Sequence, residues 1–278
     1  MTNTDRYLRL LRKSLLNQPY LDNELRIQYL LKCLSGSEAY SPAGLLDVIA
    51  RRPEAWAQLQ QWRRDGWADN EAMEGIPYSR TMLSESRLDN IADCVRSVVA
   101  DGVPGDLMEC GVWRGGGAIF MKGVLEALGD RERTVWLADS FEGLPVPSEE
   151  LDLDLDLSRE LYPHLAVSRA EVERVFREYD LLDERVRFLE GWFRDTLATA
   201  PVETLALLRL DGDLYESTRD ALQALYHRVA PGGYIIIDDY FLPACRRAVE
   251  EFREAEGIDE AIVRIDWTGV FWRRAGHQ

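Results

Sequence analysis

The chain has 278 residues, enough for one large α/β domain with an appendage or for two modest domains. It carries 33 lysines and arginines against 49 aspartates and glutamates, a net charge of −16, and 46% of its residues are hydrophobic. This acidic balance argues against nucleic acid and against an anionic membrane surface as partners, because phosphate groups are bound by basic faces.

The sequence predicts a soluble, cytoplasmic protein. Its first residues lack the charged-then-apolar pattern of a signal peptide, and no apolar run approaches the roughly 20 residues that span a bilayer. Four cysteines are scattered without the spacing of a metal site, and we expect them to be reduced thiols that are mostly buried. They are Cys33, Cys94, Cys110 and Cys245.

Residues 1–79 predict helices and no strand. Apolar residues recur there at helical spacing in two sets: Leu8, Leu11 and Leu15, then Leu25, Tyr29 and Cys33. Ser41-Pro42 and Pro53 are typical helix starts. The same region holds Trp56, Leu59, Trp62 and Trp67. We expect most of these side chains to pack against the main domain, and a partner subunit or a large substrate to cover the rest.

From residue 80 onward, an amphipathic helix at 86–100 precedes alternating strands and helices. The predicted strands are 106–110, 134–138, 186–189, 205–210 and 234–237. The predicted helices are 116–128, 169–179, 194–199, 215–229 and 244–256. Two final runs, 261–265 and 270–272, flank a turn and predict an antiparallel hairpin. This alternation predicts an α/β fold with a mostly parallel sheet covered on both faces.

The connection at 142–167 is too long for an ordinary loop and contains a leucine-aspartate alternation at 151–157. Loops of this length in compact domains are usually functional lids or disordered segments. Two interpretations stand side by side: a lid whose leucines face a cleft, or an acidic surface loop.

Two predicted strands end in paired carboxylates. The strand at 205–210 runs into Asp211-Gly212-Asp213, and the next runs into Asp238-Asp239 after a Pro231-Gly232-Gly233 stop. Both ends reach the same edge of a parallel sheet, where ligands bind in open α/β folds. Acids at one strand end are often solvated turn formers. Acids at two neighbouring ends favour a hard cation such as Mg²⁺, which prefers oxygen ligands.

A glycine-rich turn, 109–117, follows the first predicted strand, and Asp139 follows the second. Glycines let the backbone approach a ligand closely, and an acid after the second strand can bind ribose hydroxyls. Together they indicate an adenosine-type ligand, although either feature alone is equally typical of an ordinary turn. The turn lacks the G-x-G-x-x-G pattern of dinucleotide sites.

Five segments resemble the macrocin O-methyltransferase (TylF-type) family, in matching order between about residues 77 and 274. They are the stretches at 105–116, 139–145, 191–197, 210–218 and 232–240. The resemblance implies a Rossmann-like class I methyltransferase fold with a seven-stranded sheet. It also implies S-adenosylmethionine as methyl donor, a Mg²⁺ ion, and as acceptor a sugar hydroxyl of a glycosylated natural product or nucleotide sugar.

The resemblance also assigns roles to individual residues. Those implied near the donor are Thr81, Met82, Glu109, Gly111, Asp139, Ser140, Gly191, Trp192, Phe193 and Asp211. Those implied at the metal are Asp211, Asp238 and Asp239. The expected organisation is a helical extension at 1–79, serving assembly as a homo-oligomer and the acceptor side, and a methyltransferase domain at 80–278 with its lid at 142–167.

Asp211 is the candidate general base, because it is expected to reach both the cation and the acceptor hydroxyl. Asp213 is assigned a supporting or helix-capping role, and His164 in the lid is an open candidate for proton transfer.

Two rival classes remain. A nicotinamide-dependent sugar-modifying oxidoreductase or epimerase lacks support, because the chain has neither G-x-G-x-x-G nor a Tyr-x-x-x-Lys pair. A non-catalytic donor-binding protein is permitted by the fold alone.

Overall fold

The computed structural model describes residues 1–65 and 79–276. Trp67, one of the tryptophans noted in the sequence, lies outside the described residues. Within the described part of the chain, no helix is both long enough and apolar enough to cross a membrane.

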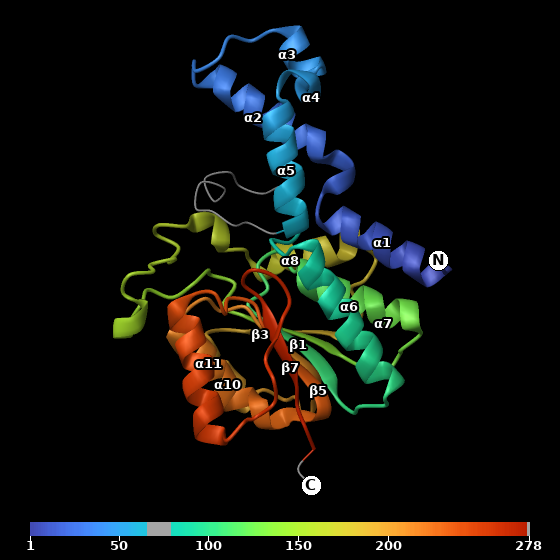
Figure 1. Cartoon of the computed structure of the whole chain (residues 1–278), viewed down its shortest axis with the longest axis vertical. Coiled ribbons are helices and arrows are strands. Elements are labelled where there is room, and N and C mark those ends of the chain that lie inside the picture. Colours follow the sequence, from blue (N-terminus) through green and yellow to red (C-terminus); the bar gives the residue numbers. More distant parts are fainter. Residues whose placement is uncertain (66–78, 277–278) are drawn as a thin grey trace.

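The strands of the described residues form one sheet (Figure 1). It has seven strands in the order β3-β2-β1-β4-β5-β7-β6. They are β1 (Asp106–Cys110), β2 (Val135–Asp139), β3 (Val186–Glu190), β4 (Leu205–Leu210), β5 (Val229–Ile237), β6 (Val263–Arg264) and β7 (Val270–Arg273). Strands β1 to β5 pair in parallel, whereas β7 pairs antiparallel with both β5 and β6. The predicted mostly parallel sheet with a terminal antiparallel hairpin is confirmed.

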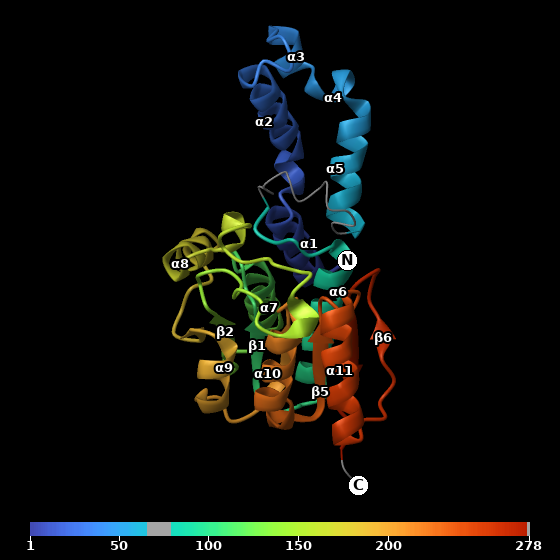
Figure 2. The same cartoon turned by 90° about the vertical axis from the view of Figure 1, so that its left-hand side faces the viewer.

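The helices of the sheet domain cover both of its faces (Figure 2). They are α6 (Glu85–Ala100), α7 (Gly116–Leu128), α8 (Arg169–Glu178), α9 (Phe193–Thr196), α10 (Tyr215–Leu225) and α11 (Pro243–Glu256). Successive strand residues point to opposite faces, so Leu107 joins the apolar cluster that contains α6, α7 and α8, whereas Met108 joins the cluster that contains α10 and α11.

The Pro231-Gly232-Gly233 segment, which we expected to stop a helix before the strand, lies inside β5 instead. Leu205 pairs with Val229 and Leu207 with Tyr234, so the register shifts across these residues. A bulge of this kind accommodates proline and a positive φ at Gly232 (88°) without ending the strand. The preceding helix, α10, accordingly ends earlier than predicted.

The N-terminal region is helical, as predicted. Its helices are α1 (Asn3–Leu15), α2 (Leu21–Leu34), α3 (Pro42–Leu46), α4 (Val48–Arg51) and α5 (Pro53–Asp65). Helix α1 buries Leu8, Leu11 and Leu15 and lies on the sheet domain beside α7. Both views show α2 to α5 extending away from the sheet (Figures 1 and 2).

Helices α2 to α5 build a small core of their own. It contains Leu21, Leu25, Tyr29, Val48 and Leu59. Trp56 and Trp62 pack against this cluster, whereas we expected most of the tryptophan side chains to pack against the main domain. A buried ion pair between Arg63 and Glu24, 2.6 Å apart, adds a polar link between α5 and α2.

The lid at 142–167 follows neither sequence interpretation fully. Leu151 and Leu153 are exposed, so the prediction that the leucines face inward is wrong for them, whereas Leu157 is buried. Asp152 is buried as well, and its carboxylate accepts hydrogen bonds from the backbone N–H groups of Tyr215 (2.7 Å) and Glu216 (3.2 Å). Asp152 thereby caps α10, whose own N-cap residue makes no side-chain bond.

Candidate functional site

A cavity opens at the carboxyl edge of the parallel strands, where the turns after β1, β2, β3 and β4 meet. Its walls are formed by Met82, Gly111, Val112, Trp113, Asp139, Ser140, Gly143, Leu144, Pro145, Leu165, Trp192, Phe193, Arg194, Asp211, Gly212, Asp213, Glu216, Ser217 and Asp220. The lining combines apolar and aromatic side chains with a group of carboxylates, Asp211, Asp213, Glu216 and Asp220, which we call the acidic wall. Such a cavity suits a ligand with an apolar ring and a polar, positively charged end.

Gly111 is required by the close approach of two strand ends. Its φ is +85°, and a Cβ atom built there would lie 1.8 Å from the backbone carbonyl oxygen of Asp211. The two ends are joined through Asp211, whose N–H donates to the Cys110 carbonyl at 2.9 Å. Only glycine fits this position, and it keeps the first turn of the cavity open.

Asp139 faces the cavity and is held by the backbone on both sides. Its carboxylate accepts hydrogen bonds from the N–H groups of Val112 and Phe141, each at 2.7 Å. Burial raises the pKa of Asp139, and these backbone donors oppose that rise by stabilising the charged form. The neighbouring Ser140 donates to the Gly143 carbonyl at 2.7 Å, which shapes the start of the lid.

Seven of the sequence-predicted donor residues line the cavity: Met82, Gly111, Asp139, Ser140, Trp192, Phe193 and Asp211. Three others are not among the lining residues. Thr81 is buried and its hydroxyl accepts from the Leu83 N–H, Gly191 turns the chain with φ +136°, and Glu109 is buried with its carboxylate against Gly117. The ring of His164, the open candidate in the lid, is likewise not part of the lining.

Three carboxylates gather at the carboxyl edge of the sheet, two of them on the acidic wall. Asp211, Asp213 and Asp239 each place an oxygen within 4.8 Å of the others, and Asp239 also accepts from the Asp213 N–H at 3.1 Å. Burial, followed by the charges of Asp211 and Asp238, raises the pKa of Asp213 to about 8. Burial and the charge of Asp213 raise the pKa of Asp239 well above its ordinary value. These groups therefore favour protons or a cation at neutral pH.

Asp238, the third metal ligand predicted from the sequence, lies in a different environment. Its side chain is 5% exposed and forms ion pairs with Arg87 and with Arg209, the latter at 2.6 Å. Proximity thus groups Asp213, not Asp238, with Asp211 and Asp239.

The two arginines are site residues that the sequence analysis missed. Arg209 interrupts the apolar run Leu205–Leu210, and a charged residue in a buried strand signals a charged partner nearby.

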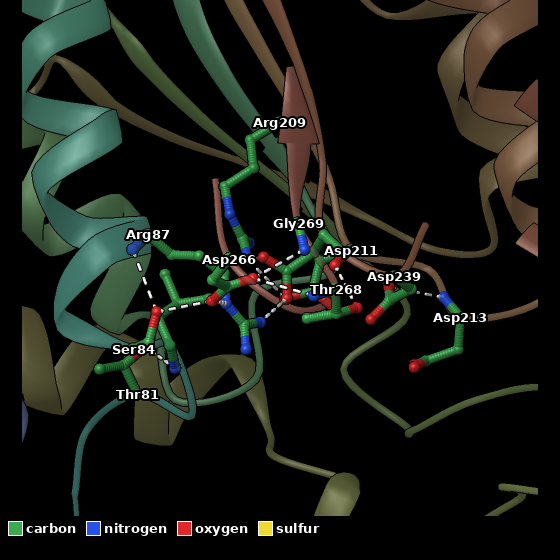
Figure 3. A network of polar contacts seen from close by, with 12 residues as sticks. Thr81, Ser84, Arg87, Arg209, Asp211, Asp213, Asp239, Asp266, Thr268 and Gly269 are labelled. Carbon is green, nitrogen blue, oxygen red and sulfur yellow. Dashed lines mark hydrogen bonds and ion pairs between the residues drawn. The ribbon is translucent and has the colours of Figure 1, made fainter. Parts of the chain in front are cut away.

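Figure 3 shows how this network continues toward the C-terminal hairpin. Arg87 Nε donates to Asp266 at 2.9 Å, and Ser84 donates to the same carboxylate at 2.8 Å. Asp266 also accepts from the N–H groups of Thr268 and Gly269. The start of α6 and the turn between β6 and β7 are therefore fixed to the acidic edge of the sheet.

These three carboxylates are ligands of the kind that a hard divalent cation prefers. Asp211, Asp213 and Asp239 offer carboxylate oxygens only, and burial among neighbouring carboxylates raises the pKa values of Asp213 and Asp239. Asp211 is the member that lies between the cluster and Arg209, whose Nη2 is 2.9 Å from its Oδ2.

Fold and site together define a class. A parallel sheet with an antiparallel strand inserted at one end, a glycine turn after β1 and an acid after β2 are features of the class I, S-adenosylmethionine-dependent methyltransferases.

Comparison with known proteins gives the family. The model of the macrocin O-methyltransferase (TylF) family matches residues 4–274, so the chain belongs to this family and is an S-adenosylmethionine-dependent O-methyltransferase. The match extends to the N-terminal helices, which the sequence motifs alone did not reach. The family match also argues against the alternative of a nicotinamide-dependent enzyme.

Two curated relatives and one solved structure resemble the chain over most of its length. Demethyldecarbamoylnovobiocin O-methyltransferase of Streptomyces niveus is 46% identical over 257 residues, covering 91% of this chain and 94% of that protein. The 8-demethyl-8-(2,3-dimethoxy-alpha-L-rhamnosyl)-tetracenomycin-C 4'-O-methyltransferase of Streptomyces olivaceus is 54% identical over 198 residues, covering 70% and 76%. The structure of the O-methyltransferase NovP superposes with a TM-score of 0.79 at 41% identity, covering 99% of this chain and 100% of that chain.

Gly111→Ala should abolish donor binding, because the new Cβ would overlap the Asp211 carbonyl and push β1 and β4 apart. Gly102→Ala is the matched control: its φ is also positive (+64°), but no atom lies within 4 Å of the added Cβ. We expect the control to cost about 1 kcal/mol of stability and to bind normally. Titration calorimetry with S-adenosylhomocysteine measures the difference, and equal affinities in the two variants would contradict this account.

Stability without a divalent cation should fall as the pH rises from about 6 to about 8. The folded-state pKa values of Asp213 and Asp239 lie above the ordinary value of 3.8, so the folded protein holds protons that the unfolded chain has released. Mg²⁺ should displace these protons, and its stabilising effect should therefore grow over the same range. Thermal unfolding with and without Mg²⁺ tests this, with Asp213→Asn as the control that weakens both trends. A Mg²⁺ effect that is absent, or that shrinks with pH, would refute the interpretation.

Proposed function

We propose that this enzyme transfers the methyl group of S-adenosylmethionine to a sugar hydroxyl of a glycosylated small molecule. The observation that carries the proposal is that the candidate base, Asp211, lines the same cavity as Gly111 and Asp139. A hydroxyl bound at the acidic wall would thus face a donor bound against the glycine turn. The tetracenomycin relative is named for methylating a position of a rhamnosyl glycoside, which supports a sugar as acceptor.

In this proposal the apolar part of the cavity holds the donor. Asp139 accepts the ribose hydroxyls with the lone pairs that its two backbone donors leave available, and Ser140 stands beside it. Trp192 and Phe193 provide aromatic surface for the adenine, and Met82 closes the cavity from the segment before α6. Gly111 leaves room for the methionine end. Thr81, Gly191 and Glu109 support the lining residues from outside the cavity.

The acidic wall holds the acceptor. A bound Mg²⁺ would lower the pKa of the acceptor hydroxyl. Asp211 would take the proton, since it reaches the cavity while its Oδ2 is held by Arg209. Because the methyl sulfonium is already a reactive donor, holding the hydroxyl oxygen in line with the methyl group supplies much of the remaining rate.

Asp211 and Asp239 are proposed ligands of the cation, and two residues compete for the third carboxylate. The resemblance to the family assigns Asp238. The distances favour Asp213, because Asp238 is already paired with Arg87 and Arg209. The two assignments make opposite predictions for single substitutions.

We also propose that the N-terminal helices serve the acceptor side and the assembly of a homo-oligomer. Leu31, Leu34 and Leu46 are exposed on this extension and offer apolar surface for such contacts.

The enzyme should methylate glycosides and not their sugar-free aglycones. Incubation of both with S-adenosylmethionine, followed by mass spectrometry of the products, tests this directly, and nucleotide sugars form a third arm. Methylation of nucleotide sugars alone would mean that methylation takes place before the sugar is transferred to the aglycone. Equal methylation of glycoside and aglycone would refute the sugar hydroxyl as the acceptor.

Removal of divalent cations with EDTA should abolish turnover, leave binding of S-adenosylhomocysteine nearly unchanged, and be reversed by Mg²⁺. Asp239→Asn should raise the Mg²⁺ concentration for half-maximal activity by about tenfold or more. Asp211→Asn should stay poorly active at saturating Mg²⁺, because it also removes the base.

Asp213→Asn and Asp238→Asn decide the third ligand. If Asp213 is the third ligand, Asp213→Asn should raise the Mg²⁺ concentration for half-maximal activity as Asp239→Asn does, and Asp238→Asn should not. If Asp238 is the ligand, the two outcomes are exchanged. Full activity in EDTA, or an unimpaired Asp211→Asn variant, would leave positioning alone as the source of catalysis.

A further inference from the structure

Arg209 is a cationic side chain enclosed by acids. It lies in β4, next to β1 and β5 in the middle of the sheet, and its side chain is 1% exposed. Its Nη1 is 2.6 Å from Glu109, and its Nη2 is 2.9 Å from Asp211 and 2.6 Å from Asp238. A charge this deeply buried is costly unless it is paired, so these contacts stabilise its position.

Strand register explains why these four side chains meet. Glu109 pairs directly with Arg209 across β1 and β4, so both point to the same face of the sheet. Asp211 follows Arg209 by two positions, and Asp238 follows Ile236, the partner of Arg209 in β5, by two positions. The alternation of a strand places all of them on one face.

Only one of the three carboxylates reaches the cavity. The Asp211 side chain is 31% exposed and lines the cavity, whereas those of Glu109 and Asp238 are 2% and 5% exposed. Arg209 holds Asp211 by a single oxygen, Oδ2, and leaves Oδ1 free of this contact. The same guanidinium is itself fixed by Glu109 and Asp238, so it cannot follow Asp211 if that side chain turns.

We propose that Arg209 is a positioning residue of the methyl transfer: its guanidinium, anchored by Glu109 and Asp238, fixes the direction in which the Asp211 carboxylate faces the acceptor. This inference rests on the proposed function, in which Asp211 is the base. Arg209 touches neither cavity nor ligand and acts only through Asp211.

Substitution of Arg209 by lysine distinguishes the role of its positive charge from the role of its planar guanidinium. Arg209→Lys keeps one positive charge in the cluster, but an ammonium group lacks the planar fork that reaches Glu109, Asp211 and Asp238 together. If Arg209 serves only to neutralise the acids, lysine should suffice. If it orients Asp211, lysine should fail.

Arg133→Lys is the matched control. Arg133 is also largely buried, with its side chain 13% exposed, and donates to the carbonyl oxygens of Val103 and Gly105 at the opposite edge of the sheet. Its substitution removes a comparable fork while leaving the acidic wall untouched. Thermal unfolding of both variants measures how much stability is lost when a buried arginine is replaced by lysine.

We expect Arg209→Lys to lower kcat by about tenfold or more with a smaller change in the KM of the glycoside, and Arg133→Lys to lower neither beyond about threefold. Binding of Mn²⁺, measured by electron paramagnetic resonance without donor or acceptor, should weaken in Arg209→Lys only, because Asp211 is one of the proposed ligands. A crystal structure of Arg209→Lys should show the Asp211 carboxylate turned from its present direction.

A fall in kcat that merely follows the loss of thermal stability in both variants would overturn the proposal. So would an Arg209→Lys enzyme with unchanged kcat, Mn²⁺ affinity and Asp211 direction. If the wild-type protein methylates none of the glycosides, the proposed function fails, whereas the Mn²⁺ and crystallographic comparisons still decide whether Arg209 orients Asp211.

Discussion

The balance between buried arginines and carboxylates at the carboxyl edge of the sheet underlies the whole site. Arg209 and Arg87 pair with Glu109, Asp238 and Asp266 in positions that water scarcely reaches. Removing one member of such a buried pair typically costs about 3–5 kcal/mol, because an uncompensated charge is left behind. Asp211 is the member of this network that also lines the cavity, beside Asp213. The buried pairs thus form a scaffold that holds Asp211 at the cavity.

This arrangement also connects distant segments of the chain. The Arg87–Asp266 pair ties the start of α6 to the C-terminal hairpin, and the hydroxyl of Thr268 donates to the Asp238 carbonyl at 2.9 Å. On the other side, Asp152 of the lid caps α10, which begins beside the Asp211-Gly212-Asp213 turn. Residues outside the cavity lining therefore hold the turns at this edge of the sheet.

Much of the fold could be predicted from the sequence, because strand and helix periodicities are local. The order of strands and helices, the terminal hairpin and the N-terminal helices with Leu8, Leu11 and Leu15 buried are confirmed. The leucine-aspartate alternation of the lid left two interpretations open, and neither anticipated that Asp152 is buried as the cap of its partner helix α10 while Leu151 and Leu153 are exposed. That partner lies more than sixty residues away along the chain.

The sequence by itself determined that acids and glycines stand at the ends of particular strands, and that parallel strands bring those ends to one edge. The tertiary structure decided which acids meet arginines and which face the cavity. Asp238 and Asp239 are adjacent in sequence, yet one joins Arg209 and the other joins Asp213. Successive residues at a strand end point in opposite directions, and their partners depend on the register of neighbouring strands, which local sequence patterns do not specify.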